Sequence, residues 1–308
     1  MFNALGVGVS YLLGTLIVSE VTSEDAKHSH DEVSKIINET NGAFNKEAVQ
    51  SDIEILMYVY AGVSTVISLL IILYFPSQPP SPPSNSASED RMGFMAGIKS
   101  LLFSKNAWLI MMTYSMSQGL VQMWQSSMVI NLTSMDIEVS ETWASTLGIV
   151  ISFSAVAASI IIATFIDYFR KKMKLAIFIL LCLSGLIFIF CTLITEGIIS
   201  FSHFSSFKIV MYVLLVTGVC LSCGCAPIAF EFCVELCYPV AEGTIGIWLT
   251  VWFNILSALF FGVFQIPNIG TQWLNYVLPC SVLLPLPALL MVKEDYKRSK
   301  LDDIISVK

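Results

Sequence analysis

Eight long runs of apolar residues constrain this chain more than any other feature. A membrane-spanning α-helix needs roughly 20 apolar residues, and runs of about that length lie at 2–19, 54–75, 107–131, 144–166, 175–195, 209–230, 244–265 and 272–292. The runs are continuous and do not alternate with period two, so they predict helices and not the strands of a barrel. With 56% hydrophobic and 13% charged residues among 308, the sequence predicts an all-α polytopic membrane protein with about eight transmembrane helices.

Basic residues indicate how these spans are oriented. If the spans alternate, the connections 76–106, 167–174 and 231–243 and the tail after 292 lie on one side and carry twelve of the 16 Lys and Arg residues. Lys and Arg are enriched in cytosolic loops, so we expect this side, including the C-terminus, to be cytosolic. Asn38 begins the sequon Asn-Glu-Thr on the opposite, lumenal side and is a candidate glycosylation site.

The runs and their connections divide the chain into four segments. Residues 1–75 hold two spans and an acidic lumenal loop at 20–53, 76–106 form a Pro- and Ser-rich cytosolic linker, 107–292 hold six spans, and 293–308 form a cytosolic tail. Six helices behind a long linker are typical of the C-terminal half of a 6+6 transporter of the major facilitator superfamily. We therefore expect a partial fold of this kind, comprising spans 5–12 of 12. The chain would then be truncated at its N-terminus, lack its own first helices as partners, and not transport by itself.

The run 107–131 carries a row of polar side chains on one helical face. Tyr114, Gln118, Gln122 and Gln125 have offsets of 0, 4, 8 and 11, and Trp124 adjoins them. An amide that faces hydrocarbon loses its hydrogen bonds to water at a cost of several kcal/mol. We therefore expect this face to line a wet cavity in which Trp124 stacks on a planar solute. The alternative is hydrogen bonding between helices with no solute involved.

A second polar row lies on the run 244–265. Thr250, Asn254 and Ser257 are spaced four and three residues apart, again on one face. We expect the two rows to border the same cavity as substrate-binding residues. Amides and hydroxyls beside aromatic rings suit a neutral, polar, ring-shaped solute, and the spans offer no buried Arg or Lys that would bind a strongly anionic one.

Two further groups of charged residues are candidates for gating and proton coupling. The stretch ATFIDYFRKKMK resembles a loop signature of the superfamily and contains Asp167, Arg170, Lys171 and Lys172. Its carboxylate could bind the positive N-terminal end of a neighbouring helix, although basic residues at a cytosolic turn need no such role.

Glu231 and Glu235 lie four residues apart at the expected cytosolic end of a span, before Pro239 ends the helix. Partial burial and a like-charged neighbour disfavour the charged carboxylate, so this pair is a candidate proton carrier. The alternative is structural: both glutamates pair with Arg170, Lys171 or Lys172 and lock a cytosolic gate.

The stretch FEFCVELCYPVAEGT, residues 230–244, resembles a motif of solute carrier family 49 of the major facilitator superfamily. The matching residues are Glu231, Glu235, Tyr238, Pro239, Glu242 and Gly243. The resemblance extends at scattered positions along the whole chain and points to a lysosomal branch. It implies a secondary transporter of a small organic nutrient such as pyridoxine (vitamin B6), coupled to protons.

Other branches of that family carry choline, and haem has been claimed as a substrate. This sequence has Ala4, and Phe253 with Asn254, where the choline-type pattern has Gln, which disfavours choline. A receptor or scaffold without transport activity, and a channel, are the remaining alternatives.

Several functions are not supported by the sequence. It contains no phosphate-binding Gly loop, no His-rich metal motif and no nucleophile with base partners, so we expect neither an enzyme nor a bound cofactor or metal. The net charge of −7 is concentrated in the acidic loop and does not suit a nucleic-acid surface. CLSCGC, residues 220–225, is interpreted as close helix packing by small side chains. The expected partners are a small-molecule substrate, protons and the lipid bilayer.

Overall fold

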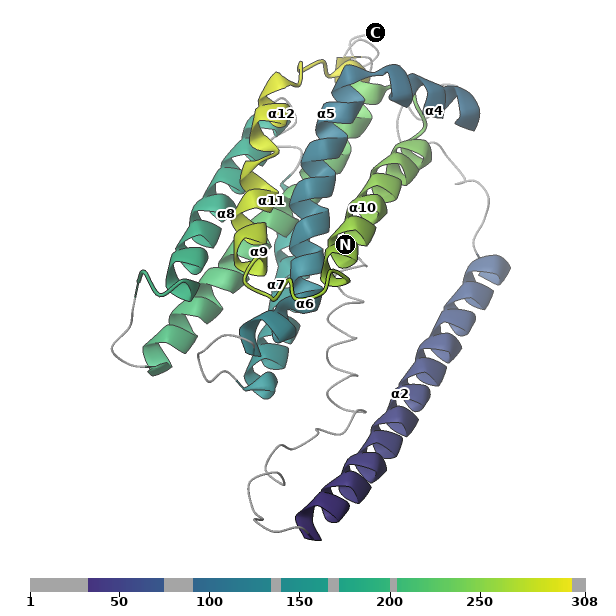
Figure 1. The fold of residues 1–308 in the computed structure, drawn as a ribbon. Coiled ribbons are helices and arrows are strands. Elements are labelled where there is room, and N and C mark those ends of the chain that lie inside the picture. The colour runs from purple at the N-terminus through teal and green to yellow at the C-terminus, as the bar shows by residue number, and fades with distance from the viewer. Residues whose placement is uncertain (1–32, 75–90, 134–139, 166–171, 200–203, 301–308) are drawn as a thin grey trace. The chain divides into compact units, whose positions relative to one another are not determined.

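The computed structural model describes residues 33–74, 91–133, 140–165, 172–199 and 204–300 (Figure 1). Within these ranges the chain is helical apart from turns and one isolated bridge between Met92 and Val240. The chain divides into two compact units, one of residues 9–81 and the other of residues 1–8 with 82–308. The units are described separately.

The described part of the smaller unit is one long helix, α2 (Val33–Tyr74). Its portion Gln50–Tyr74 has a mean hydropathy of 2.2 and is long enough to cross a membrane, as predicted for the run 54–75. The acidic segment expected to be a loop is helical from Val33 onward, and Asn38 lies within this helix. The residues preceding the span include Lys, Glu, Ala and Gln, which favour helix, so polarity alone does not break the helix here.

The larger unit is a helical bundle. Its elements in chain order are α4 (Phe94–Phe103), α5 (Lys105–Tyr114), the π-helix η2 (Ser115–Leu120), α6 (Val121–Thr133), α7 (Glu141–Thr164), α8 (Met173–Thr195), α9 (Phe204–Cys237), α10 (Glu242–Phe264), α11 (Leu274–Leu283) and α12 (Leu286–Met291). We call the end of the bundle at which α8 and α10 begin and α9 ends the tail-side end, because the chain continues from α12 there (Figure 1).

Six helices in the described residues are long and apolar enough to span a membrane. They are Gln50–Tyr74, Thr142–Thr164, Met173–Thr195, Phe207–Cys237, Glu242–Phe264 and Leu274–Met291, each overlapping a predicted run. The predicted run 107–131 is covered by α5, η2 and α6, which follow one another without a break. The run 2–19 lies outside the described residues. The prediction of an all-α polytopic membrane protein is confirmed.

Helix α9 packs against α7, α8 and α5 and forms the centre of the bundle. Small residues allow this close approach. A Cβ atom at Gly218 would lie 2.5 Å from the Phe188 ring of α8, and one at Gly224 would overlap Ile162 of α7. The Ser184 hydroxyl donates a hydrogen bond of 2.8 Å to the Gly218 carbonyl. Gly224 lies within CLSCGC, so this motif does take part in helix packing, as predicted from its small side chains.

The segment predicted as an extended linker contains a helix near its end. Helix α4 begins at Phe94 and diverges from the direction of α5 (Figure 1). Ser104 lies between the two helices. Its hydroxyl caps α5 by accepting a hydrogen bond of 3.3 Å from the Ala107 N–H. Gly97 lets α4 approach α10, because a Cβ there would lie 3.2–3.3 Å from Val240 and Thr244.

Candidate functional site

The predicted glutamine row is divided among three consecutive elements. Tyr114 ends α5, Gln118 lies in η2, and Gln122 and Gln125 lie in α6. A π-helical turn holds more residues than an α-helical turn, so the offsets expected for a continuous α-helix do not hold across η2. π-Helical turns often occur at functional sites, and this one was not predicted from the sequence.

Gln118 is buried and bonds to α9. Its Nε2 donates to the Ser222 carbonyl at 2.9 Å and lies 3.7 Å from the Cys225 sulfur. In return, the Ser222 hydroxyl donates to the Ser117 carbonyl at 3.1 Å. This reciprocal pair of hydrogen bonds joins η2 to α9 in the interior of the bundle.

Gln125 makes the corresponding contact with α7. Its Nε2 donates to the Ser152 hydroxyl at 2.7 Å, and that hydroxyl donates to the Gly148 carbonyl at 2.8 Å. In this conformation the amides of Gln118 and Gln125 therefore make hydrogen bonds between helices, as the non-binding alternative expects. Tyr114 and Gln122 are half-buried. A role of the four residues in binding solute stays a prediction.

A proline in α9 creates a further polar contact that sequence reasoning missed. Pro227 lies inside the helix and has no N–H to donate to the carbonyl of Cys223, four residues earlier. The Ser159 hydroxyl of α7 donates to this carbonyl at 3.1 Å. The sequence signal was the proline itself, because a freed carbonyl in a membrane helix needs another donor.

Trp124 lies in the interior, with 2% of its surface exposed. Its indole N–H has no hydrogen-bond partner among the described residues. Together with Asn131, Thr192 and Asn275 it lines a cavity of about 10 Å³, which has room for a single water molecule and not for a planar solute. Stacking of Trp124 on a solute would therefore need another conformation and stays a prediction.

The second polar row lies on α10 and is more accessible. Thr250 and Asn254 are exposed, and the Asn254 amide donates to the Thr250 carbonyl at 2.8 Å. Ser257 is buried and donates to the Phe253 carbonyl at 2.9 Å. Phe253 is the residue of α10 that lies beside Gly119 of η2. The side chain of Asn254, the next residue of α10, is exposed on this apolar helix.

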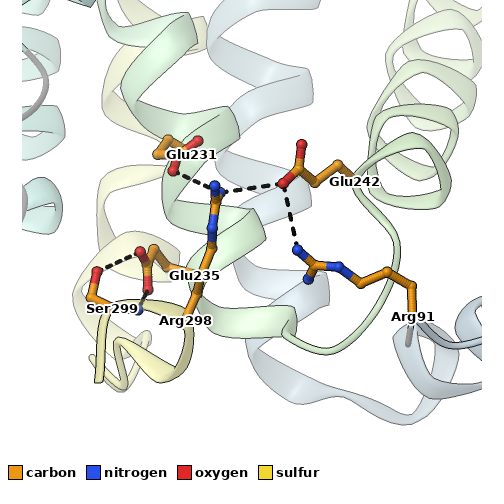
Figure 2. A network of polar contacts seen from close by, with 6 residues as sticks. All are labelled: Arg91, Glu231, Glu235, Glu242, Arg298 and Ser299. Atoms are coloured by element: carbon orange, nitrogen blue, oxygen red, sulfur yellow. Dashed lines mark hydrogen bonds and ion pairs between the residues drawn. The ribbon is translucent and has the colours of Figure 1, made fainter. Parts of the chain in front are cut away.

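An ion-pair network occupies the tail-side end of the bundle (Figure 2). Arg298 Nη1 lies 3.1 Å from Glu231 Oε1 of α9 and 3.3 Å from Glu242 Oε1 of α10. Arg91, which precedes α4, lies 3.9 Å from the same Glu242 oxygen, and its guanidinium carbon lies 4.9 Å from the Tyr238 ring centroid. Glu231, Tyr238 and Glu242 of the motif at 230–244 therefore meet at these two arginines.

Glu235 is held by the residue that follows Arg298. Its carboxylate accepts hydrogen bonds from the Ser299 N–H at 3.0 Å and the Ser299 hydroxyl at 2.6 Å. Only 2% of Glu235 and 3% of Ser299 are exposed. A buried carboxylate requires such donors, because burial without them is costly.

These contacts add partners to the structural alternative for the two glutamates. Lys172 is exposed at the N-cap of α8, and Asp167, Arg170 and Lys171 lie outside the described residues. Among the described residues, Glu231 and Glu235 bond to Arg298 and Ser299 of the segment after α12, which sequence reasoning treated as a plain tail. Pairing with Arg170 or Lys171 stays a prediction. The signal that sequence reasoning overlooked was the mixture of acidic and basic residues in EDYKRSK, residues 294–300, because mixed charges supply partners for helix ends.

Two titrating groups of this segment have shifted pKa values. Burial, and next the nearby Glu294 carboxylate, raise the pKa of Tyr296 to about 12. The Tyr296 hydroxyl accepts from the Met173 N–H at 3.2 Å and donates to Glu294 at 3.1 Å. The pKa of Asp295 is lowered, chiefly by its hydrogen bond of 2.8 Å from Lys300.

The described residues offer no site for a metal ion. No group of three or more His, Cys, Asp or Glu side chains is arranged to hold one in these ranges. All eight cysteines are free.

The fold and its contacts define a polytopic helical membrane protein whose buried amides and hydroxyls join its helices.

Comparison with known proteins finds similarity to proteins named as transporters or solute carriers. Along its whole length it is similar to the solute carrier family 49 member 4 homologues of Xenopus tropicalis and Xenopus laevis, with 29% and 27% identity. A choline/ethanolamine transporter of Homo sapiens is 22% identical over 97% of the chain and 52% of its own length. An uncharacterized MFS-type transporter of Caenorhabditis elegans is 26% identical over 97% of the chain and 47% of its own length. No family model matches.

The predicted resemblance to solute carrier family 49 is confirmed, and the relatives support a partial major facilitator superfamily fold. These relatives are named as transporters or solute carriers and not as enzymes, in agreement with the expectation from the sequence. The chain spans 64% of the length of the two Xenopus relatives.

Proposed function

We propose that this chain forms the larger part of a secondary transporter that moves a small polar organic solute across the lysosomal membrane. Its similarity to solute carrier family 49 over the whole chain supports this proposal. The residues proposed to contact the solute are those of the two polar rows: Tyr114, Gln118, Gln122, Trp124, Gln125, Thr250, Asn254 and Ser257.

The exposed amide of Asn254 is the observation that carries the solute pathway. It lies near the middle of α10, a 23-residue apolar helix, and hydrogen-bonds within its own helix to the Thr250 carbonyl. The remaining hydrogen-bonding capacity of an amide at membrane depth is costly to leave in lipid. A water-filled pathway bordered by this face of α10 satisfies it.

The proposed solute is a neutral ring bearing hydroxyl groups, such as pyridoxine, moved with protons. Amides and hydroxyls near aromatic rings can bind such a molecule by hydrogen bonds and stacking. The carboxylates Glu231 and Glu235 are the candidate proton carriers, together with Asp167 and the basic residues that follow it. A positively charged amine is the second candidate, because the human relative is named as a choline/ethanolamine transporter.

In this proposal the C-terminus lies in the cytosol and Asn38 on the lumenal side, where it carries the glycan. The excess of Lys and Arg at the tail-side connections supports the orientation. The alternatives of a receptor or scaffold without transport predict no uptake at all.

Uptake into vesicles tests the proposal. The chain, extended at its N-terminus to the length of its relatives, would be reconstituted and supplied with labelled pyridoxine or choline between about pH 5 and pH 8. We expect saturable, pH-dependent uptake of pyridoxine that exceeds uptake of choline. Equal uptake at every pH would refute proton coupling, and preference for choline would favour the second candidate.

A variant pair separates solute contact from folding. We expect Asn254→Leu to abolish uptake while leaving thermal unfolding unchanged, because its amide bonds, among the described residues, to a backbone carbonyl of its own helix. Ile255→Leu is the matched control, since Ile255 is also exposed on α10 and the substitution conserves volume. Full uptake by Asn254→Leu would remove α10 from the solute pathway.

A further inference from the structure

A small polar cavity lies in the larger unit, towards the end of the bundle opposite the tail-side end. Residues of α6, α8, α9 and α11 line it, and its volume is about 10 Å³. Five of its ten lining residues carry a polar group: Trp124, Asn131, Thr192, Thr195 and Asn275. Polar groups between membrane helices need hydrogen-bond partners inside the protein, so the bonds of these five residues decide what the cavity can hold.

Asn275 fixes the walls of the cavity. Pro279 lies inside α11 and has no N–H to donate to the Asn275 carbonyl, four residues earlier. The Thr192 hydroxyl of α8 donates to this carbonyl at 2.8 Å. The Asn275 side chain accepts from the Asn131 amide of α6 and donates to Glu196, both at 3.2 Å. One residue of α11 thus joins α6 to α8 and to the residue that follows α8.

The indole of Trp124 has no comparable bond. Its N–H is buried without a hydrogen-bond partner among the described residues, and 2% of the residue is exposed. A buried donor without a partner bears the full cost of losing its hydrogen bonds to water. The Thr192 and Thr195 hydroxyls donate to backbone carbonyls at 2.8 and 3.0 Å, and their oxygens keep lone pairs that can accept. The cavity therefore combines a donor that needs an acceptor with two oxygens that can accept.

The size and charge of the cavity determine the ligand that fits it. Its volume corresponds to about one water molecule. None of the ten described residues that line it is Asp, Glu, Lys or Arg, so a cation or an anion would find no opposite charge in the lining, and a buried ion without one is very costly. A water molecule is neutral, accepts from the indole, and has two hydrogens for the two hydroxyl oxygens.

We propose that this cavity is a binding site for one water molecule, which accepts a hydrogen bond from the Trp124 N–H and donates to the Thr192 and Thr195 hydroxyls. The water bridges α6 and α8 and holds Trp124 inside the bundle. The site does not depend on the proposed transport function, so measurements of uptake do not decide it.

Ultraviolet resonance Raman spectroscopy of the chain in mixed micelles tests the bond to the indole, because an indole band responds to hydrogen bonding of the N–H. The spectrum of the wild type minus that of Trp124→Phe isolates this tryptophan among the six. Trp108→Phe gives the reference for a bonded indole, since the Trp108 N–H donates to the Leu102 carbonyl at 2.8 Å. We expect the Trp124 band to match the Trp108 band. A Trp124 band at the position of a free N–H would overturn the proposal.

Radiolytic oxidation tests for the water itself and needs no variant. X-rays convert a bound water into hydroxyl radicals, which oxidise the side chains that touch it. Met211 lines the cavity and is 1% exposed, whereas Met128 is 0% exposed and does not line it. Burial protects both from radicals formed in the solvent, so we expect sulfoxide to form about tenfold faster at Met211, measured by mass spectrometry. Equal rates at the two methionines would show that the cavity holds no water.

A pair of double-mutant cycles tests the bridge from Trp124 to Thr192. Trp124→Phe removes the donor, and Thr192→Val removes the hydroxyl with little change of shape. We expect this cycle to show a coupling of about threefold or more in the folding equilibrium, followed by circular dichroism during titration with detergent. Thr192→Ser is the matched control, because it keeps the hydroxyl and its cycle with Trp124→Phe should show no coupling. Zero coupling in the first cycle, or equal coupling in both, would overturn the bridge, since the latter result would come from packing alone.

Discussion

The hydrogen bond between Gln125 and Ser152 allows the two interpretations of the glutamine row to be tested against each other. The donor and acceptor atoms lie 2.7 Å apart, and the side chains are 6% and 1% exposed. Hydrogen bonds between membrane helices contribute about 0.6 kcal/mol on average and up to about 1.7 kcal/mol. Because this bond is short and fully enclosed, we expect a coupling free energy in that range, a factor of roughly 3 to 18 in the folding equilibrium.

The perturbation is a double-mutant cycle of Gln125→Leu and Ser152→Ala. Unfolding would be induced by titration with sodium dodecyl sulfate in mixed micelles and followed by fluorescence of the six tryptophans. The cycle isolates the interaction of the two side chains. Ser126→Ala is the control, because Ser126 is exposed on the same helix and bonds to a carbonyl of its own helix.

The same variants would be assayed for uptake. If Gln125 joins helices, uptake should fall only as far as the folded fraction falls, and the double mutant should be less destabilised than the sum of the single mutants. A coupling free energy of zero, together with loss of uptake by Gln125→Leu at unchanged stability, would refute the structural interpretation and support the proposed contact of Gln125 with the solute.

Two further predictions concern Pro227 of α9 and Tyr296 in the segment after α12. Ser159→Ala should destabilise the chain by about 0.5–1.5 kcal/mol, and by less than half as much in a Pro227→Ala background, where the restored N–H can serve the Cys223 carbonyl; equal costs in both backgrounds, measured by the same titration, would show that the proline does not free that carbonyl. The pKa of Tyr296 is raised to about 12 from its ordinary 10, so the unfolded chain loses this proton first as pH rises, and the stabilisation present in full below about pH 10 should be lost between about pH 10 and pH 12. Phenolate absorbance of the wild type minus that of Tyr296→Phe measures the shift, and a folded midpoint near 10 would contradict it.

The sequence alone determined the class of the fold. Continuous apolar runs of about 20 residues can only be satisfied in a bilayer by helices, since each backbone N–H and carbonyl must bond within its own segment. The positions of α7, α8 and α10 follow directly from these runs. The motif at 230–244 likewise marked the residues that meet at the tail-side end, because charged residues at the end of an apolar helix are seldom without a partner.

The partners themselves were decided only by the tertiary structure. Periodicity places Gln118 and Gln125 on a face, but it does not say which helix that face meets, and the bundle sets α9 beside one amide and α7 beside the other. The π-turn at 115–120 changes the register of that face, and periodic reasoning assumes a constant one. The bond from Arg298 to Glu231 joins residues 67 positions apart in the chain. Such a contact depends on where the segment after α12 lies in the fold. Ion pairs form between residues that are close in space, and spacing along the chain does not reveal which residues these are.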